Sequence, residues 1–256
     1  DIAGNTREDF GKTITDWDTE ENREERWHGP GRAVHSQDLF DEKIVEFIRA
    51  NADRPFFLYH PSQLPHGPVI TTEIDPAVRD NDELTQYEKE YASMVLRLDR
   101  TVGVIMDELR RLGLEERTLL VFSSDNGHAP TYRQAGRHEP ERNLVTGEPY
   151  DNVTTKYYTE LSGDVFNGND GMAGRKFTNW EGGITLPYVM RWPGTIDPGR
   201  DCNVLMANYD FMPTIAEVLG TEVPGGDGVS VWRAIRGETE RRSGRDYIVV
   251  GSQQGP

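Results

Sequence analysis

Short apolar runs between polar or turn-forming residues predict the strands of this chain. Residues 55–60 begin with the letters PFFLY, and residues 118–124 begin with TLLVF, a β-branched run with no Gly or Pro inside. A third strand is predicted at residues 186–191 and a closing one at residues 247–250. Each run is short enough to be a strand buried in a sheet.

Apolar residues that recur every three or four positions predict three helices. The first covers residues 37–51, with Ser36 as its N-cap. The longest covers residues 82–112, where one apolar stripe continues up to Gly113, a residue suited to the left-handed position that ends many helices. The third covers residues 210–219. We expect the longest helix to pack against the sheet.

Composition narrows the class of protein. With 256 residues, 35% hydrophobic and 28% charged, the chain is long enough to bury a substantial core, and its balance is that of a globular domain. No apolar run approaches the length needed to cross a bilayer, and the first residues lack the basic start and apolar stretch of a signal peptide. The net charge of −16 argues against a nucleic-acid partner.

A carboxylate and an amide follow directly on the strand predicted at residues 118–124. Asp125 and Asn126 place hard oxygen donors at its C-terminal end, where open α/β sheets bind ligands. Such donors suit a hard divalent cation, Ca²⁺ or Mg²⁺. The alternative interpretation is an ordinary turn, because Asp, Asn and Gly dominate turns for backbone reasons.

Several short motifs occur in a fixed order along the chain. They are PFFLY with PHGP after it, then SDNG, then GRKFTNWEGG, and then RWPG. Taken together, over residues 35–235, they resemble the formylglycine-dependent sulfatases of the alkaline phosphatase superfamily. The resemblance implies an α/β fold, alkaline phosphatase-like and incomplete here, with a mostly parallel central sheet that has helices on both faces.

The same resemblance implies how the chain is divided. Residues 1–34 are expected to be an irregular N-terminal segment. Residues 35–220 are expected to be the C-terminal part of the sulfatase α/β core, with a long loop at residues 128–173. Residues 221–256 are expected to be the start of a small C-terminal subdomain.

Half of the family pattern is missing from these residues. Members of the family carry a pair of metal-binding Asp residues and a C-x-P-S-R or C-x-A-S-R motif toward the N-terminus, and the Cys of that motif becomes the formylglycine nucleophile. The single cysteine, Cys202, lies in DCNVL and does not fit. A single cysteine also excludes an internal disulfide. We therefore expect the chain alone to be inactive and its partner to be the missing N-terminal half of the enzyme.

The motifs also carry the expected site residues. Asp125 and Asn126 match the second pair of metal ligands, with Ca²⁺ favoured over Mg²⁺. His66 matches the histidine that binds sulfate and donates a proton to the leaving oxygen, and Lys176 matches the lysine on the sulfuryl oxygens. His128, next to SDNG, is a candidate for substrate binding. The alternative for each is an ordinary loop side chain in contact with solvent.

Three functions remain open at this point. The first is a sulfuric ester hydrolase that acts on the sulfate ester of a sugar or an aryl alcohol, in a periplasmic, secreted or lysosomal setting as in the family. The second is a phosphodiesterase or phosphonate hydrolase of the same superfamily, although such relatives often carry Asp-His where this chain has Asp125-Asn126. The third is a non-catalytic fragment that binds a ligand or partner without turnover.

Overall fold

The computed structural model describes residues 35–67, 69, 71, 73–129, 164–176, 178–223, 225–238 and 245–251. These residues pack into two compact units. The first unit holds the described residues up to Leu114 and those within Asn126–Lys176 and Trp180–Thr185, and the second holds the others. The predicted segment 1–34 and most of the predicted 128–173 loop lie outside the described residues, and the domain division stays a prediction.

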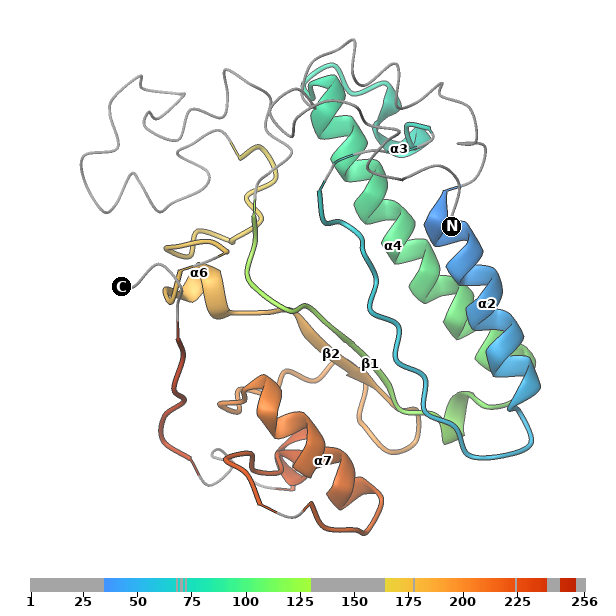
Figure 1. Cartoon of the computed structure of the whole chain (residues 1–256), viewed down its shortest axis with the longest axis vertical. Coiled ribbons are helices and arrows are strands. Elements are labelled where there is room, and N and C mark those ends of the chain that lie inside the picture. The colour runs from blue at the N-terminus through green and yellow to red at the C-terminus, as the bar shows by residue number, and fades with distance from the viewer. Residues whose placement is uncertain are drawn as a thin grey trace, which may run out of the picture. The chain divides into compact units, whose positions relative to one another are not determined.

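Two helices, α2 (Ser36–Ala50) and α4 (Gln86–Arg111), form the framework of the first unit (Figure 1). Ile44 and Ile48 of α2 are 5% and 1% exposed and pack against Leu109 of α4. Burying each such side chain contributes about 1.5–3 kcal/mol. The helices predicted at residues 37–51 and 82–112 are therefore confirmed, although α2 is shifted by one residue toward the N-terminus and α4 is shorter than predicted.

The residues that cap the two helices explain where each helix begins. The His35 Nδ1 accepts the Gln37 N–H at 3.1 Å, so His35 caps α2 in place of the expected Ser36. Thr85 and Glu88 form a capping box that starts α4 at Gln86. A short helix that the sequence pattern did not predict, α3 (Pro76–Arg79), precedes it.

Residues 55–60 are extended, but they form no strand within the described part of the chain. Phe56 and Leu58 pack on the apolar cluster of α2 and α4, whereas Phe57 and Tyr59 are 71% and 75% exposed. The apolar run therefore serves to cover the helices along one side of an extended segment. The expectation that it shares a sheet with residues 118–124 is not met here.

The second unit contains a two-stranded sheet of β1 (Leu120–Ser123) and β2 (Tyr188–Arg191). The pair is antiparallel, with Leu120 opposite Arg191 and Ser123 opposite Tyr188. Both strands were predicted. The expected parallel pairings do not occur among the described residues, because an apolar run predicts a strand without fixing the direction of its neighbour.

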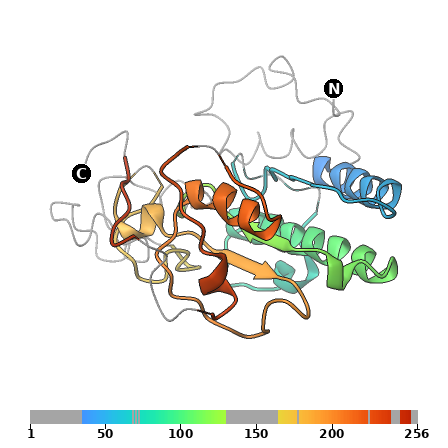
Figure 2. The same ribbon diagram turned by 90° about the horizontal axis from the view of Figure 1, so that it is seen from below.

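Helices of the second unit pack on this sheet (Figure 2). The 3₁₀ turns η2 (Glu115–Arg117) and η4 (Asn208–Asp210) precede β1 and α7 (Phe211–Val218), and α8 (Trp232–Ile235) follows. The core of this unit holds Trp232 and Ile235 with Met190 and Val218 against them. The helix predicted at residues 210–219 is thereby confirmed as α7.

The last described segment, residues 245–251, contains no strand, so the strand predicted at residues 247–250 is not present. Tyr247 and Val249 are 74% and 76% exposed, and an apolar run without a neighbouring strand forms no ladder. Within the described residues, no helix is both long and apolar enough to cross a bilayer.

Candidate functional site

Three loops of the first unit are joined by main-chain hydrogen bonds at the SDNG motif. The Gly127 N–H donates to the Gly183 carbonyl at 2.9 Å, and the Lys176 N–H donates to the His128 carbonyl at 2.8 Å. The Gly182 N–H donates to the Ala173 carbonyl at 2.7 Å. Residues of SDNG and of GRKFTNWEGG, two motifs far apart in the sequence, therefore lie against one another.

The glycines of these motifs are required by how closely the loops approach. A Cβ on Gly127 would overlap the Gly182 carbonyl oxygen and lie 2.7 Å from the main chain of Gly183. A Cβ on Gly182 would lie 2.5 Å from the Gly174 carbonyl oxygen. The short helix α6 (Glu181–Ile184) holds the second of these loops in place. Main-chain atoms cannot rotate away as side chains do, so only glycine fits at Gly127 and Gly182.

Neighbouring side chains hold the His128 ring in place where these loops meet. Its Nε2 is 3.1 Å from the Asp164 Oδ2, and the Asp164 side chain is fully buried. The rings of His128 and Tyr91 meet edge to face, with centroids 6.5 Å apart and planes at 70°. A buried carboxylate and an aromatic ring therefore hold the imidazole that was expected to contact substrate.

Tyr91 projects from α4 toward this group. Its ring centroid lies 6.0 Å from that of Phe166. Burial, and secondarily the negative charge of Asp164, raise the pKa of the Tyr91 phenol to about 12. Tyr91 lies within the helix predicted at residues 82–112, and it packs against the buried cluster that contains Met94. Its contact with His128 was not predicted.

Lys176 is half-buried, and its main chain is tied to His128. Asn126 is also half-buried, and its Nδ2 donates to the Gly127 carbonyl at 2.9 Å. The structure therefore brings Asn126, His128 and Lys176 onto loops that are bonded to each other. Asp125 is exposed and belongs to the second unit, at the end of the loop that follows β1.

His66 lies in a turn of its own in the first unit. Its N–H donates to the Gln63 carbonyl at 2.8 Å, and its Nδ1 is 2.6 Å from the Gly67 carbonyl oxygen. The side chain is exposed. The expectation that His66 converges with Lys176 on one sulfate-sized volume stays a prediction.

The donors at Asp125 and Asn126 fit a hard divalent cation by type. A carboxylate and an amide oxygen are the ligands that Ca²⁺ and Mg²⁺ take, but two side chains fill only part of a calcium shell of six to eight oxygens. In the described part of the chain, no group of three or more His, Cys, Asp or Glu side chains is arranged to hold a metal. A cation at Asp125 and Asn126 therefore needs further ligands.

Asp164, the buried partner of His128, is the residue of this candidate site that sequence reasoning missed. It lies in a polar, Gly- and Asn-rich stretch without periodicity, so no pattern singles it out. The signal that existed was indirect: a buried histidine needs a hydrogen-bond partner. Which of the many carboxylates supplies it depends on tertiary structure.

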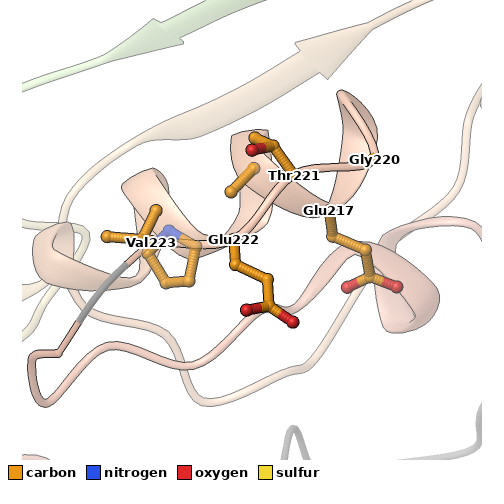
Figure 3. A pocket seen from close by; sticks show the side chains of 7 residues that line it. Glu217, Gly220, Thr221, Glu222 and Val223 are labelled. Atoms are coloured by element: carbon orange, nitrogen blue, oxygen red, sulfur yellow. The ribbon is translucent and has the colours of Figure 1, made fainter.

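A surface hollow of about 510 Å³ lies elsewhere, in the second unit at the end of α7 (Figure 3). Its lining includes Glu217, Thr221, Glu222 and Val223. None of the predicted site residues contributes to it. The hollow is open and carries acidic groups, which do not suit an anionic substrate.

Comparison with known proteins assigns the class. The family model described as Sulfatase matches residues 3–221. A sulfatase of Formosa agariphila is 26% identical over 241 residues, which cover 87% of this chain and 37% of that protein. The mouse steryl-sulfatase is 30% identical, over 79% of this chain and 28% of that protein. The chain thus spans about a third of the length of the curated relatives that it matches.

Solved structures agree with this assignment. The structure of Ps i-CgsB in complex with k-i-k-neocarrahexaose superposes with a TM-score of 0.59 at 25% identity, over 81% of this chain and 40% of that one. The fold is therefore the α/β fold of the sulfatases, of which the chain holds a part. The chain belongs to the sulfatase family, whose members generally use formylglycine and a divalent cation.

Proposed function

We propose that this chain carries anion- and cation-binding side chains of a sulfuric ester hydrolase that acts on a sulfate ester of a sugar or an aryl alcohol. The observation that supports it most is the hydrogen bond from the Lys176 N–H to the His128 carbonyl. That bond keeps a lysine of one family motif beside a histidine next to another. The expected roles of the two side chains require this proximity.

Each side chain has a role that its chemistry allows. The Lys176 ammonium binds the sulfuryl oxygens, because it is a compact charge with three donors. The His128 imidazole contacts the substrate beside it. His66, as an imidazolium, binds the sulfate and gives its proton to the departing alkoxide or phenoxide oxygen. In an acidic chain these cations provide the local positive charge that an anionic ester needs.

A divalent cation belongs at Asp125 and Asn126, with Ca²⁺ favoured over Mg²⁺ because both donors are hard oxygens and Ca²⁺ accepts irregular geometry. When bound, it supplies positive charge to the sulfuryl oxygens. The nucleophile lies outside these 256 residues, since no C-x-P-S-R or C-x-A-S-R motif occurs among them. The partner is therefore a polypeptide segment with that motif, in a periplasmic, secreted or lysosomal setting.

The binding half of this proposal can be tested on the chain as it is. Affinity for 4-nitrophenyl sulfate is measured by NMR titration of the 256-residue chain and of two variants, Lys176→Ala and Lys43→Ala. Lys43 is a matched control, because it lies exposed on α2 in an ion pair with Glu46. Losing a hydrogen bond between charged groups costs about 1.5–3 kcal/mol, so Lys176→Ala should weaken binding at least about tenfold and Lys43→Ala should not.

The competing functions give different outcomes. Preference for bis(4-nitrophenyl) phosphate over the sulfate would favour the phosphodiesterase of the same superfamily. Binding of neither ester would favour a non-catalytic fragment. Binding of the sulfate that is indifferent to Lys176→Ala would remove Lys176 from the site.

A further inference from the structure

We propose that Asp164 is a positioning residue that fixes the ring orientation and the tautomer of His128 beside Lys176. The catalytic part of this proposal rests on the function proposed above, because that function makes His128 a substrate contact. The bond between the Asp164 carboxylate and the imidazole stands on its own geometry. Asp164 Oδ2 is 3.1 Å from the His128 Nε2, and the Asp164 side chain is 0% exposed.

The carboxylate is itself held by the main chain. Asp164 Oδ1 accepts the Phe166 N–H at 3.1 Å, and Oδ2 accepts the Gly168 N–H at 3.2 Å. These donors fix both oxygens of a buried group that cannot turn to water. Asp164 therefore presents a fixed acceptor to the histidine.

Contacts on the ring itself leave it little room to move. A Cβ added to Gly168 would lie 2.5 Å from both Cε1 and Nε2 of His128, so the imidazole rests directly on this glycine. Tyr91 meets the ring edge to face on α4, the most regular element of the unit. The imidazole is thus located by Asp164, Gly168 and Tyr91 together.

This arrangement sets where the ring proton lies. An ionised carboxylate only accepts hydrogen bonds, so Nε2 must carry a proton, and in the neutral imidazole Nδ1 must then be unprotonated. The His128 carbonyl accepts the Lys176 N–H at 2.8 Å. Anchoring His128 therefore also anchors the loop from which the Lys176 ammonium projects.

The first test reads the hydrogen bond directly. In the 256-residue chain at about pH 9, where an ordinary imidazole is neutral, ¹H–¹⁵N NMR should show a His128 Nε2 proton that is protected from exchange with water. Asp164→Ala, which removes the acceptor, should abolish this protection. Asp170→Asn, which removes the charge of an exposed carboxylate in the same loop, should preserve it. A protected Nε2 proton in a folded Asp164→Ala variant would overturn the proposal.

A second variant covers the case in which Asp164→Ala does not fold. Gly168→Ala adds a methyl group where the ring rests, and it should displace the imidazole and expose the Nε2 proton while Asp164 remains. A Gly168→Ala spectrum identical to that of the unmodified chain would contradict the geometry. In both variants the backbone amide spectrum reports whether the fold is kept.

The last test separates this proposal from the proposed function. Affinity for 4-nitrophenyl sulfate should fall about fivefold or more in Asp164→Ala or Gly168→Ala and stay unchanged in Asp170→Asn. If these variants lose only the protected proton while Lys176→Ala still weakens binding, Asp164 positions no ligand-binding group and this inference fails alone. If Lys176→Ala has no effect either, the sulfate site and the role of Asp164 in it both fail.

Discussion

The α2–α4 helix pair is held together by a different kind of contact from the loops that meet at Gly127. Between the helices, side chains make the contacts: the Arg49 guanidinium donates to both Glu108 oxygens at 2.8 and 3.1 Å, and Arg97 pairs with Asp38. In the loops, main chain meets main chain and side chains are absent where the approach is closest.

The difference separates the loops that carry the proposed site residues from the helices that stabilise the unit. Side-chain packing tolerates exchange, because a neighbouring side chain can adjust to a new volume. Main-chain contact tolerates almost none, and it places His128 and Lys176 relative to one another through the bond between their main chains. The polar side chains of the helix pair, in contrast, make the contacts that stabilise the pair.

The largest expected effect tests the loops. Gly127→Ala places a methyl group against the Gly182 carbonyl and should lower the free energy of unfolding by about 3 kcal/mol. Gly103→Ala is the control, because Gly103 lies exposed on α4 with open space around it. This variant should raise the free energy of unfolding by about 0.5–1 kcal/mol. Urea denaturation measures both. Equal free energies of unfolding for the two variants would show that the main chains at Gly127 leave room for a side chain.

A smaller effect is expected from the polar side chains between the helices. Gln37 is 1% exposed and donates to Asp41 and Thr101 at 2.9 and 3.1 Å. Gln37→Ala removes this donor from the buried Thr101 hydroxyl and the half-buried Asp41 carboxylate, which should lower the free energy of unfolding by about 2 kcal/mol. Gln63→Ala, at an exposed position, should change the free energy of unfolding by less than about 0.5 kcal/mol. A neutral Gln37→Ala would mean that water replaces the amide.

The free energy of unfolding at alkaline pH should depend on Tyr91, which packs beside the loops. The pKa of Tyr91 is about 12 in the folded chain and near 10 when unfolded, so ionisation favours the unfolded state between these values. Stability that is complete below about pH 10 should therefore be lost as pH rises toward about 12. Tyr91→Phe should make this loss shallower in denaturation series from pH 9 to 12. An unchanged slope would show that Tyr91 is not buried beside Asp164.

The free energy of unfolding at acid pH should depend on Glu108, which links the two helices. Hydrogen bonds from Arg111 and Arg49 lower the pKa of Glu108 to about 2, well below its ordinary value. Its contribution is therefore complete above about pH 4.5 and should disappear as pH falls toward about 2. Glu108→Gln should flatten this part of the stability curve and leave the alkaline limb as it is. A change in the alkaline limb alone would contradict the assignment.

Sequence pattern predicted the two regions unequally. The apolar stripe with Met94 and Leu109 predicted α4, because helical periodicity is a local property. The bounds depended on single caps such as His35, and the pairing of β1 with β2 depended on tertiary contacts. Motif order indicated Asn126 and Lys176, and the position next to SDNG made His128 a candidate, but neither showed that their loops are bonded. Asp164 could not be predicted, since its role exists only once the chain has folded.

We propose that these 256 residues bind a sulfate ester and lack the group that attacks it. The measurement is release of 4-nitrophenol from 4-nitrophenyl sulfate, at concentrations that saturate binding, by a preparation whose intact mass shows only this chain. We predict no release above the uncatalysed rate, because no formylglycine motif occurs in the sequence. Sustained turnover by such a preparation would contradict the account, since a nucleophile would then lie within the chain.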